Sequence, residues 1–508
     1  MSLMKRRDER APRRKHRRPG MQLSAMAAAL LVAGGLTAWS LTPEKADAAQ
    51  EPVAAGDDFN GDGYADLVSG APGASVAGKE QAGYVAVTYG SGDGVDPAQK
   101  KVVSRATSEV PGAAEAKQRF GKTFSKGDLD GDGYGDLVIG SDKAASGSVV
   151  LWGSPDGLRD GTAIDDYGRT PQVGDFDGDG KDDLALFADA EVAGDDPVKQ
   201  DTNLWKGPIS RAGEPAERLD FWDKSEWWGY DHDNAECATD DSCIDGPDST
   251  SGPVAAKAVG DLNGDDVEDL VLWLYEGDGV WGTHAMLGGA TGFTKGGSVG
   301  DFGTSGGDAA TDVGDVDGDG FDDVVVGSSE DTSKVTVAFG TSEGPSQERV
   351  QSFDQTLPGF YGAQEKGDRV GSCVAVADVT GDGRAEVALG ISGEDFSDLT
   401  NAGTVALLHG TDNGVTGEGS QVLNQNTKGV PGVAEKGDEF GSACALLDTD
   451  GDGPGDLAVA AESENSDAGA VWSLRGSADG LTTEGASAFG PGDLDAPERA
   501  ARFGHHLS

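Results

Sequence analysis

Short apolar runs recur along the chain, and each has the length of a β-strand rather than of a helix. One set of runs begins with Gly, continues with mainly apolar residues and ends in a Gly-rich turn, as in GYVAVTYG from Gly83, GSVVLWG from Gly147, GTVALLHG from Gly403 and GAVWSLRG from Gly469. Branched and aromatic residues in short runs bounded by Gly are typical of strands. No segment shows a convincing helical period. The pattern therefore predicts an all-β chain of short antiparallel strands.

A second set of apolar runs follows an acidic loop of one design, which occurs seven times. The loops begin at Asp58, Asp128, Asp175, Asp261, Asp315, Asp378 and Asp448. An aromatic residue and Gly stand eight residues before several of them, as Phe120-Gly121, Tyr167-Gly168 and Phe440-Gly441, with Val370-Gly371 as a variant. Each unit supplies about four strands and cannot bury its faces alone. We therefore expect a seven-bladed β-propeller of four-stranded antiparallel blades, with a linear stack of units as the alternative.

The acidic loops carry oxygen-bearing side chains at positions 1, 3, 5 and 9, counted from the first Asp. These residues are Asp58, Asn60, Asp62 and Asp66; Asp128, Asp130, Asp132 and Asp136; Asp175, Asp177, Asp179 and Asp183; Asp261, Asn263, Asp265 and Asp269; Asp315, Asp317, Asp319 and Asp323; Asp378, Thr380, Asp382 and Glu386; and Asp448, Asp450, Asp452 and Asp456. Hard oxygen ligands at this density suit Ca²⁺. Position 7 is expected to add a backbone carbonyl, from Tyr64, Tyr134, Lys181, Val267, Phe321, Arg384 and Pro454. The sequence thus predicts up to seven calcium sites.

The acidic loop is not an EF-hand, although its first half matches one. An EF-hand needs a bidentate Glu at position 12 and continues as a helix. Position 12 is here Ser69, Ile139, Leu186, Leu272, Val326, Leu389 and Val459, and a strand-like run follows. The site at Asp378 is expected to be the weakest, because Thr380 replaces a carboxylate. Calcium is expected to stabilise the fold rather than to take part in a reaction.

These residues resemble the FG-GAP repeats of integrin α-subunit propellers, in a form typical of secreted bacterial proteins. The first copy carries Gly70-Ala71-Pro72, and the link before the aromatic–Gly pair matches at Val110–Glu115 and Val430–Glu435. The resemblance covers nearly all of 51–508 and implies a calcium-binding propeller. It is weak for function, because such propellers serve many roles. The other domains of an integrin have no counterpart in this sequence.

Composition and the first residues bear on where the protein acts. The formal net charge is −51, which argues against nucleic acid and anionic membranes as partners. Residues 1–48 combine a basic run with an apolar stretch from Ala25 to Trp39, and Ala46-Asp47-Ala48 offers a cleavage site. We interpret 1–48 as an export signal peptide and 49–508 as the propeller of a secreted protein without membrane attachment after cleavage. An uncleaved N-terminal anchor is the alternative.

The four cysteines fit an exported protein. Cys237 and Cys243 lie close together, so a local disulfide is expected. Cys373 and Cys444 occupy neighbouring places in successive units and could form a bridge. Their offsets from the following Asp differ by one residue, which would place them on opposite strand faces. Two buried free thiols are therefore an equal alternative.

The segment from about 212 to 256 is an irregular insertion rich in aromatic and acidic residues. Trp222, Trp227, Trp228 and Tyr230 could stack on sugars or anchor a protein partner, and they are the speculative ligand-binding residues. The alternative is that the aromatic residues only hold the insertion against the blades.

The sequence favours a ligand-binding or adhesion module with an extracellular protein or glycan as partner. We find no persuasive catalytic constellation, because the Gly-x-Ser-x-Gly matches at 296–300 and 303–307 lack the context of a nucleophile elbow. The competing functions are an extracellular hydrolase or lyase acting on a polysaccharide or ester, and a sugar-binding lectin.

The segment Arg502-Phe503-Gly504 repeats the aromatic–Gly strand, so we expect residues 499–508 to close the ring by packing into the first blade beside Val53–Gly56.

Overall fold

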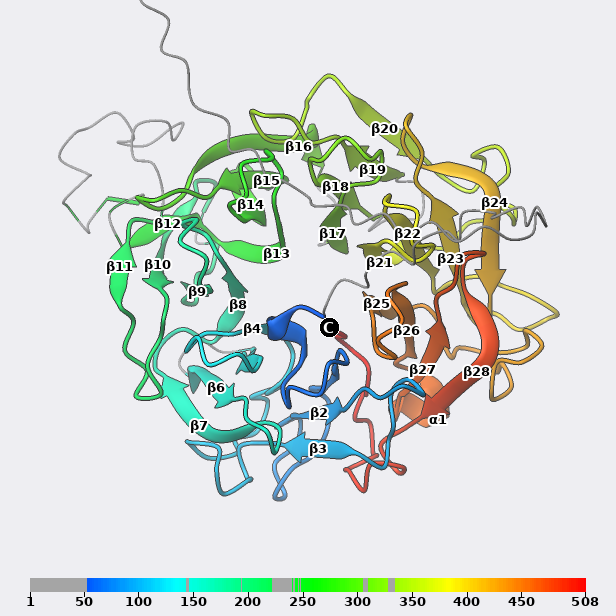
Figure 1. Ribbon diagram of the computed structural model, residues 1–508, viewed down its shortest axis with the longest axis horizontal. Coiled ribbons are helices and arrows are strands. Elements are labelled where there is room, and N and C mark those ends of the chain that lie inside the picture. The colour runs from blue at the N-terminus through cyan, green and yellow to red at the C-terminus, as the bar shows by residue number, and fades with distance from the viewer. Residues whose placement is uncertain are drawn as a thin grey trace, which may run out of the picture. The chain divides into compact units, whose positions relative to one another are not determined.

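The computed structural model is a ring of seven antiparallel sheets (Figure 1), which confirms the predicted all-β, seven-bladed propeller. It describes residues 53–508, apart from 143–145, 193, 222–239, 241–242, 245, 247, 305–308 and 328–333. Residues 1–48, and with them the predicted export signal, lie outside this range. Among the described residues, no helix has the length and apolarity needed to cross a bilayer.

The first four blades follow the chain in order, after a 3₁₀ turn at Ala55–Asp57. Blade 1 contains β1 (Leu67–Ala71), β2 (Tyr84–Thr88) and β3 (Lys100–Val103); blade 2 contains β4 (Phe124–Gly127), β5 (Asp136–Ile139), β6 (Ser148–Trp152) and β7 (Arg159–Ile164); blade 3 contains β8 (Arg169–Gly174), β9 (Asp183–Phe187), β10 (Val198–Lys206), β11 (Glu217–Leu219) and β12 (Ser249–Gly252), which pairs with β10; and blade 4 contains β13 (Val254–Gly260), β14 (Asp269–Gly277), β15 (Val280–Leu287) and β16 (Thr294–Thr304).

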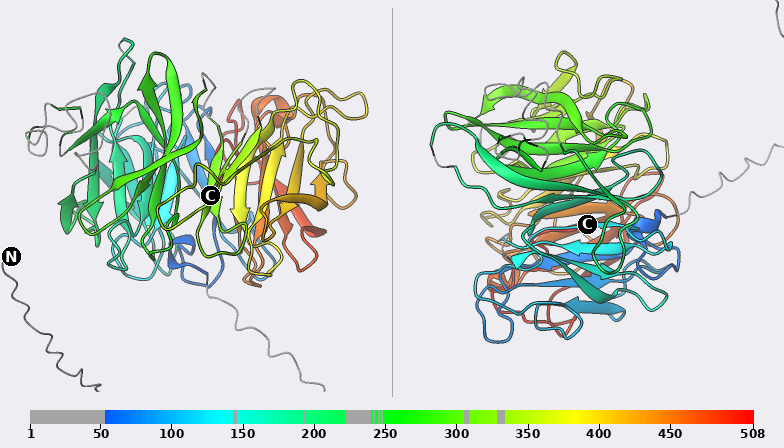
Figure 2. Two further views of the ribbon diagram at one scale, coloured as in Figure 1. Left: turned by 90° about the horizontal axis from the view of Figure 1, so that it is seen from above. Right: turned by 90° about the vertical axis from the view of Figure 1, so that its left-hand side faces the viewer.

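The remaining blades repeat the same order of four strands, with one short helix, α1 (Glu464–Asp467), in the last. Blade 5 contains β17 (Thr311–Gly314), β18 (Asp323–Val326), β19 (Val335–Ala338) and β20 (Val350–Phe353); blade 6 contains β21 (Val370–Ala377), β22 (Glu386–Ile391), β23 (Thr404–His409) and β24 (Thr416–Leu423); and blade 7 contains β25 (Ala443–Leu447), β26 (Asp456–Ala461), β27 (Ala470–Arg475) and β28 (Thr482–Phe489). The edge-on views show the blades side by side around the ring (Figure 2).

The hydrophobic core lies between neighbouring blades rather than inside any one of them. One cluster joins Val85 and Val87 of β2 to Leu137 of β5 and Leu151 of β6. Both faces of these strands are buried, so β2, β5, β6 and β9 have no exposed residue. Each blade can bury its apolar faces only against the next, which explains why the units form a closed ring.

The glycine directly before a Gly-led strand contacts the aromatic–Gly pair of the next unit. The N–H of Phe440 donates to the carbonyl of Ala402, and Gly403 has a φ of +81°. A Cβ on Gly403 would lie 2.2 Å from the carbonyl oxygen of Phe440. Only glycine has both the space and the φ angle that this contact requires. The two sequence signatures are therefore the two sides of one contact between blades.

The C-terminal segment completes the first blade as its inner strand. The N–H of Val68 donates to the carbonyl of Ser508 at 2.8 Å, and that of Gly70 donates to His506 at 3.0 Å. Phe503 is fully buried in a core cluster shared by blades 7 and 1. In Figure 1 the C-terminus lies near the axis, beside the start of the described chain. The predicted closure is confirmed, with β1 as the hydrogen-bonded partner, whereas the turn around Gly56 packs against Gly127 and Gly135 of blade 2.

A disulfide joins Cys373 of β21 to Cys444 of β25, the inner strands of blades 6 and 7. The expectation that the two side chains point to opposite faces is wrong. Strand β21 has an irregular register against β22 between Val370 and Val374, whereas β25 pairs regularly along its length. Cys373 lies in this irregular stretch, so the period-two alternation counted back from Asp378 does not hold at its position.

Two further sequence-based predictions fall partly or wholly outside the described residues. Cys243 is disulfide-bonded, and Cys237 lies outside the described residues. The speculative ligand residues Trp222, Trp227, Trp228 and Tyr230 also lie outside them. At the start of the same insertion, Phe221 is fully buried. Its ring contacts Phe187 of blade 3 and Phe293 of blade 4, with centroid distances of 5.3 and 5.2 Å. Phe221 thus packs the start of the insertion against blades 3 and 4.

Candidate metal centres

The seven acidic loops lie at one end of the blades and form a hydrogen-bonded ring. Each loop connects the first strand of a blade to the second, and in blade 1 it leads into β1. The N–H at position 8 donates to the carbonyl at position 1 of the preceding loop in six pairs: Ala65–Asp448, Gly135–Asp58, Glu268–Asp175, Asp322–Asp261, Ala385–Asp315 and Gly455–Asp378, at 2.8 to 3.1 Å. The pair Ala65–Asp448 joins blade 1 to blade 7. The loops are therefore parts of one ring-shaped assembly.

The first Asp of each loop organises the turn, as the loop at 315–323 illustrates. One oxygen of Asp315 accepts the N–H groups of Gly318 and Asp319 at 2.7 and 3.1 Å, and the other accepts that of Gly320 at 2.9 Å. Gly318 and Gly320 have φ angles of +75° and +88°. The chain can therefore wrap tightly around one carboxylate, which explains Gly at positions 4 and 6.

The acid at position 9 is buried and joins the loop to the third strand of its blade. Asp323 accepts the N–H of Val316 at 3.1 Å and that of Gly340, two residues after β19, at 2.9 Å. Burial raises the pKa of Asp323 to about 7 and that of Asp136 to about 8, although backbone hydrogen bonds oppose the shift. A nearby cation would favour the ionised form of a carboxylate in such a place.

The oxygen atoms of the loops converge as a hard metal ion requires. Ligand atoms lie within 4.8 Å of one another in four groups: Asp128, Asp130 and Asp136; Asp175, Asp177 and Asp183; Asp315, Asp317 and Asp323; and Asp448, Asp450 and Asp452. Oδ1 of Asp317, Oδ1 of Asn263 and Oδ2 of Asp183 are buried and accept no hydrogen bond. Buried acceptors without a partner are rare, and a divalent cation would satisfy them. The donor set therefore fits calcium.

The loop at 378–386 differs from the others at position 3, which is Thr380, and at position 9, which is Glu386. Its longer Glu386 accepts the N–H groups of Val379 and Thr380, both at 3.0 Å. The hydroxyl of Thr380 also donates to Glu386, and Nδ1 of His409 lies 3.2 Å from the same carboxylate. The position-9 acid is thus partly satisfied by its own loop. That this loop is the weakest site stays a prediction.

Acids at position 8 have a structural role that the sequence analysis missed. Asp182, Glu268 and Asp322 accept the N–H of the first Asp in the preceding loop, at 2.5, 2.6 and 3.0 Å. Burial raises the pKa of Glu268 to about 7. The signal was present in the sequence, because position 8 is acidic in three consecutive loops.

The carbonyl role assigned to position 7 stays a prediction. Side chains there, such as Tyr134, lie against the position-4 Gly of the preceding loop.

Comparison with known proteins agrees with the repeat architecture. The family model described as FG-GAP repeat matches residues 53–88, 120–152 and 167–200, and the model described as FG-GAP-like repeat matches 315–389. Over 100 residues the chain is 37% identical to integrin alpha pat-2 of Caenorhabditis briggsae, which covers 20% of this chain and 8% of that protein. Over 106 residues it is 36% identical to integrin alpha-PS5 of Drosophila melanogaster, which covers 20% and 10%.

Part of the chain is also similar in sequence to part of an enzyme. It is 36% identical over 102 residues to phosphatidylinositol-glycan-specific phospholipase D of Rattus norvegicus, which covers 20% of this chain and 12% of that protein. These matches span about a tenth of the length of the relatives, so the activities of the whole relatives are not carried over. Among solved structures, AofleA from Arthrobotrys oligospora aligns over 74% of this chain and 86% of its own, with 9% identity and a TM-score of 0.38. A likeness of that size does not identify a shared function.

Proposed function

Because the chain is an integrin-like β-propeller of FG-GAP repeats, we propose that it is a secreted binding or adhesion module whose acidic loops bind calcium for stability. The observation that carries the calcium part is the ring of loops with buried acceptor oxygens that lack partners. Calcium at these loops would neutralise carboxylates that the fold holds close together. Hydrogen bonds between loops connect all seven pairs of neighbouring blades, so the conformation of the loops affects the whole ring.

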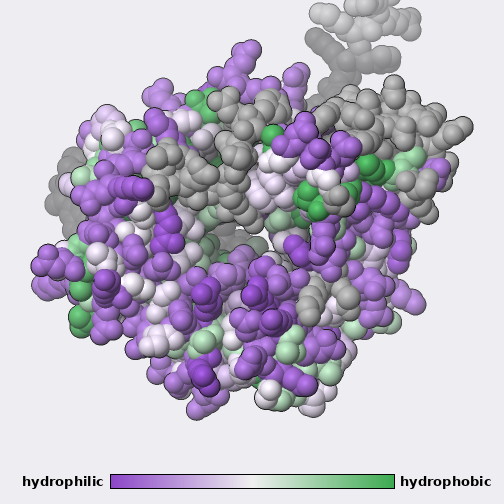
Figure 3. Space-filling model, turned by 180° about the vertical axis from the view of Figure 1, so that it is seen from behind, coloured by the Kyte–Doolittle hydropathy of each residue, from purple (hydrophilic) through white to green (hydrophobic). Residues whose placement is uncertain are grey.

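The end of the blades opposite the acidic loops offers the surface that best suits a partner. The first strand of a blade begins at the aromatic–Gly pair and ends at the acidic loop, so the links between blades lie at the opposite end. Tyr361 and Val433 lie on two neighbouring links, and their exposed fractions are 65% and 68%. These two are the most exposed of the large hydrophobic side chains in the described part of the chain. The face of the ring seen in Figure 3 lies on the side away from the 3₁₀ turn at Ala55–Asp57 (Figure 2) and is mainly hydrophilic, with small separate hydrophobic areas.

The calcium part is tested by thermal unfolding of the purified protein with calcium and with excess chelator. A site with a dissociation constant of about 0.1 mM contributes roughly 1.4 kcal/mol at about 1 mM calcium. Several such sites together contribute several kcal/mol, a large share of an ordinary folding free energy. We expect chelation to lower the Tm markedly and calcium to restore it, whereas magnesium at the same concentration should restore less. An unchanged Tm in chelator would refute the calcium part.

The binding part is tested by a screen of glycans and extracellular matrix proteins, performed with calcium and with chelator. We expect a ligand that binds only with calcium. The double variant Tyr361→Ser/Val433→Ser should lose it without a change in Tm. Val192→Ser is the matched control, because Val192 is exposed but lies in blade 3. Cleavage of a polysaccharide or ester would favour a hydrolase or lyase instead. Binding to sugars alone would favour a lectin.

A further inference from the structure

Position 3 of the acidic loops divides them into two classes that differ in charge. It is Asp130, Asp177, Asp317 and Asp450 in blades 2, 3, 5 and 7, and Asn60, Asn263 and Thr380 in blades 1, 4 and 6. Each of the four Asp residues is paired through Oδ2 with a basic side chain, in the pairs Asp130–Arg211, Asp177–Lys206, Asp317–Arg349 and Asp450–Arg475. The distance is 2.5 Å for Arg211 and 3.3 Å for Arg475. A basic side chain thus accompanies each added carboxylate.

The four basic side chains reach position 3 from different places in the fold. Lys206 and Arg475 end the third strands of their blades, directly before the glycine that donates to the position-9 acid. In blades 2 and 5 that place is taken by Trp152 and Phe339. Arg211 lies over the Trp152 ring at 5.7 Å, and Arg349 lies over the Phe339 ring at 4.1 Å. The pairing therefore arises from three backbone positions, because Lys206 and Arg475 occupy equivalent places and Arg211 and Arg349 do not.

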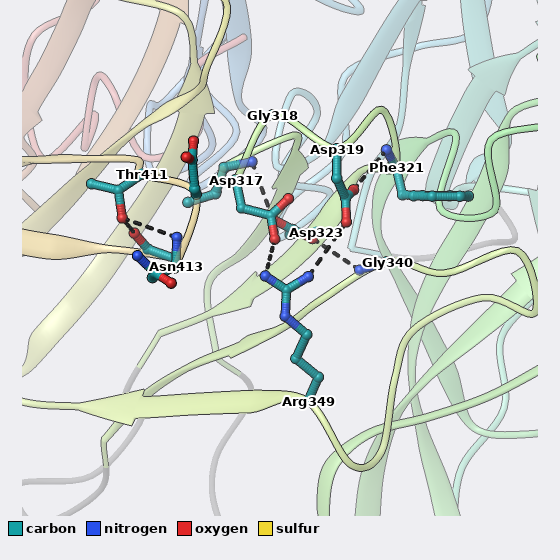
Figure 4. Close-up of polar contacts among 12 residues, drawn as sticks. Asp317, Gly318, Asp319, Phe321, Asp323, Gly340, Arg349, Thr411 and Asn413 are labelled. Carbon is teal, nitrogen blue, oxygen red and sulfur yellow. Dashed lines mark hydrogen bonds and ion pairs between the residues drawn. The ribbon is translucent and has the colours of Figure 1, made fainter.

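Three of the four basic side chains contact position 5 as well. Arg211 lies 2.7 Å from Asp132, Lys206 lies 3.2 Å from Asp179, and Arg349 lies 3.4 Å from Asp319. Asp179 is also paired with Lys181 of its own loop, at 2.8 Å. Figure 4 shows the guanidinium of Arg349 between the carboxylates of Asp317 and Asp319.

Two of the three neutral residues at position 3 donate a hydrogen bond within their own loop. The amide of Asn60 donates to Asp62 at 2.9 Å, and the hydroxyl of Thr380 donates to Glu386. Within the described part of the chain, no basic side chain is hydrogen-bonded to Asn60, Asn263 or Thr380. The net charge is counted over the side chains at positions 1, 3, 5 and 9 and the base at position 3. A loop with four carboxylates and one base has the same net charge as a loop with three carboxylates and no base. The seven ligand sets therefore carry nearly equal charge.

We propose that Lys206, Arg211, Arg349 and Arg475 are charge compensators, which set the calcium affinity of their loops by offsetting the position-3 carboxylate. This inference rests on the proposed binding of calcium. At Asp317 the base uses Oδ2, and Oδ1 is buried without a hydrogen-bond partner and can bind the metal. In the metal-free chain the base reduces repulsion among the carboxylates, and in the loaded chain it weakens attraction for the ion. Compensated loops then bind calcium about as strongly as the loops with a neutral position 3.

The inference is tested with Arg349→Gln in the full chain, by hydrogen–deuterium exchange during a calcium titration. This readout follows each loop separately. We expect the calcium midpoint for protection of the loop at 315–323 to fall about tenfold, the effect of removing one unit charge near a partly solvated divalent ion. The loop at 261–269 is the internal reference and should not change. In chelator, the Tm of Arg349→Gln should be lower than that of the unchanged protein.

Three further variants make the result specific to charge. Asp317→Asn combined with Arg349→Gln should restore both the midpoint and the Tm in chelator, and Arg349→Lys should keep the original midpoint. Arg169→Gln is the matched control, because this half-exposed Arg pairs with Asp189 at the other end of a blade. An unchanged or higher midpoint in Arg349→Gln would overturn the inference. The inference would also be overturned if calcium protected the loop at 315–323 from exchange only in Arg349→Gln and not in the unchanged protein. Arg349 would then occupy the place of the metal. If no loop of the unchanged protein responds to calcium, the proposed function itself fails.

Discussion

Single glycines decide whether neighbouring blades can touch. Gly83, Gly403 and Gly469 have φ angles of +81° to +82°, and each faces the carbonyl of a buried Phe at the distance where a Cβ would clash. The Phe rings are Phe120, Phe440 and Phe503, all fully buried. A side chain at one of these glycines would break a backbone contact and displace a core ring at the same time.

Gly469→Ala is therefore expected to destabilise the protein far more than a positive φ angle alone would. A left-handed conformation costs an alanine roughly 1 kcal/mol. Gly78→Ala measures that cost by itself, because Gly78 has a φ of +76° and nothing within 4 Å of the added Cβ. In Gly469→Ala the Cβ would lie 2.2 Å from the Phe503 carbonyl oxygen. Urea unfolding should show at least twice the loss seen in Gly78→Ala, and equal losses would contradict this account.

Ligand residues could be predicted from the sequence because their spacing is local. Asp315, Asp319 and Asp323 lie within nine consecutive positions, and the pattern recurs in every unit. The compensating bases could not be found this way. Arg211 follows β10 in blade 3, yet it pairs with Asp130 in blade 2 and rests on Trp152. Such a contact depends on how blades are placed side by side. The prediction that the site at Asp378 is the weakest counted carboxylates alone. It therefore omitted the positive charge that the basic side chains add to the loops of blades 2, 3, 5 and 7.

Pairs of strands from neighbouring blades are held by covalent as well as apolar contacts. The inner strands β21 and β25 are joined by the disulfide between Cys373 and Cys444, both of which are nearly buried. The strands themselves could be predicted from alternation and Gly-rich turns. The irregular stretch of β21 near Cys373 could not be predicted, because the expected alternation of side chains between two faces assumes a regular strand.

Replacing both cysteines with alanine is expected to lower the Tm, because the unfolded chain gains conformational freedom. The disulfide closes a segment with a sequence separation of 71 residues, for which the chain-entropy estimate is about 4 kcal/mol. Calorimetry of Cys373→Ala/Cys444→Ala without reductant isolates this disulfide, since a reductant would also act on Cys243. Reductant added to the double variant should cause a smaller further change. A double variant as stable as the unchanged protein would show that blade packing alone fixes these strands.

At the scale of the whole molecule, the ring is closed at two places between blades 7 and 1. Residues 506–508 pair with β1 by backbone hydrogen bonds, and Ala65 donates to Asp448 across the acidic loops. Tyr84 of β2 stacks on Phe503 with a centroid distance of 6.5 Å. The sequence could predict this closure because Phe503-Gly504 repeats a motif that begins an inner strand elsewhere. It could not give the pairing with β1, which depends on register.

Deleting residues 499–508 is expected to destabilise the whole ring and to promote association. The deletion exposes the edge of β1 and the apolar surface that Phe503 and Leu507 cover, and unpaired edges bind other strands. Thermal unfolding and light scattering should show a lower Tm and larger species. The full-length variant Phe503→Ala/Leu507→Ala should have a milder form of both effects, since its backbone can still pair. A truncated protein that stays monomeric with an unchanged Tm would make the segment dispensable.

The inner strand of blade 1 comes from the far end of the chain, and this arrangement sets the order of assembly. As the chain emerges from its N-terminus, blades 2 to 7 can form in sequence, whereas β1 must wait for residues 503–508. During this interval the edge of β1 can accept the same strand from a second copy. Since the exchanged strand makes identical hydrogen bonds, two such copies would each be complete while remaining linked. Strand-swapped dimers should therefore form when the protein refolds at high concentration, and they should persist after dilution because separation requires both rings to open.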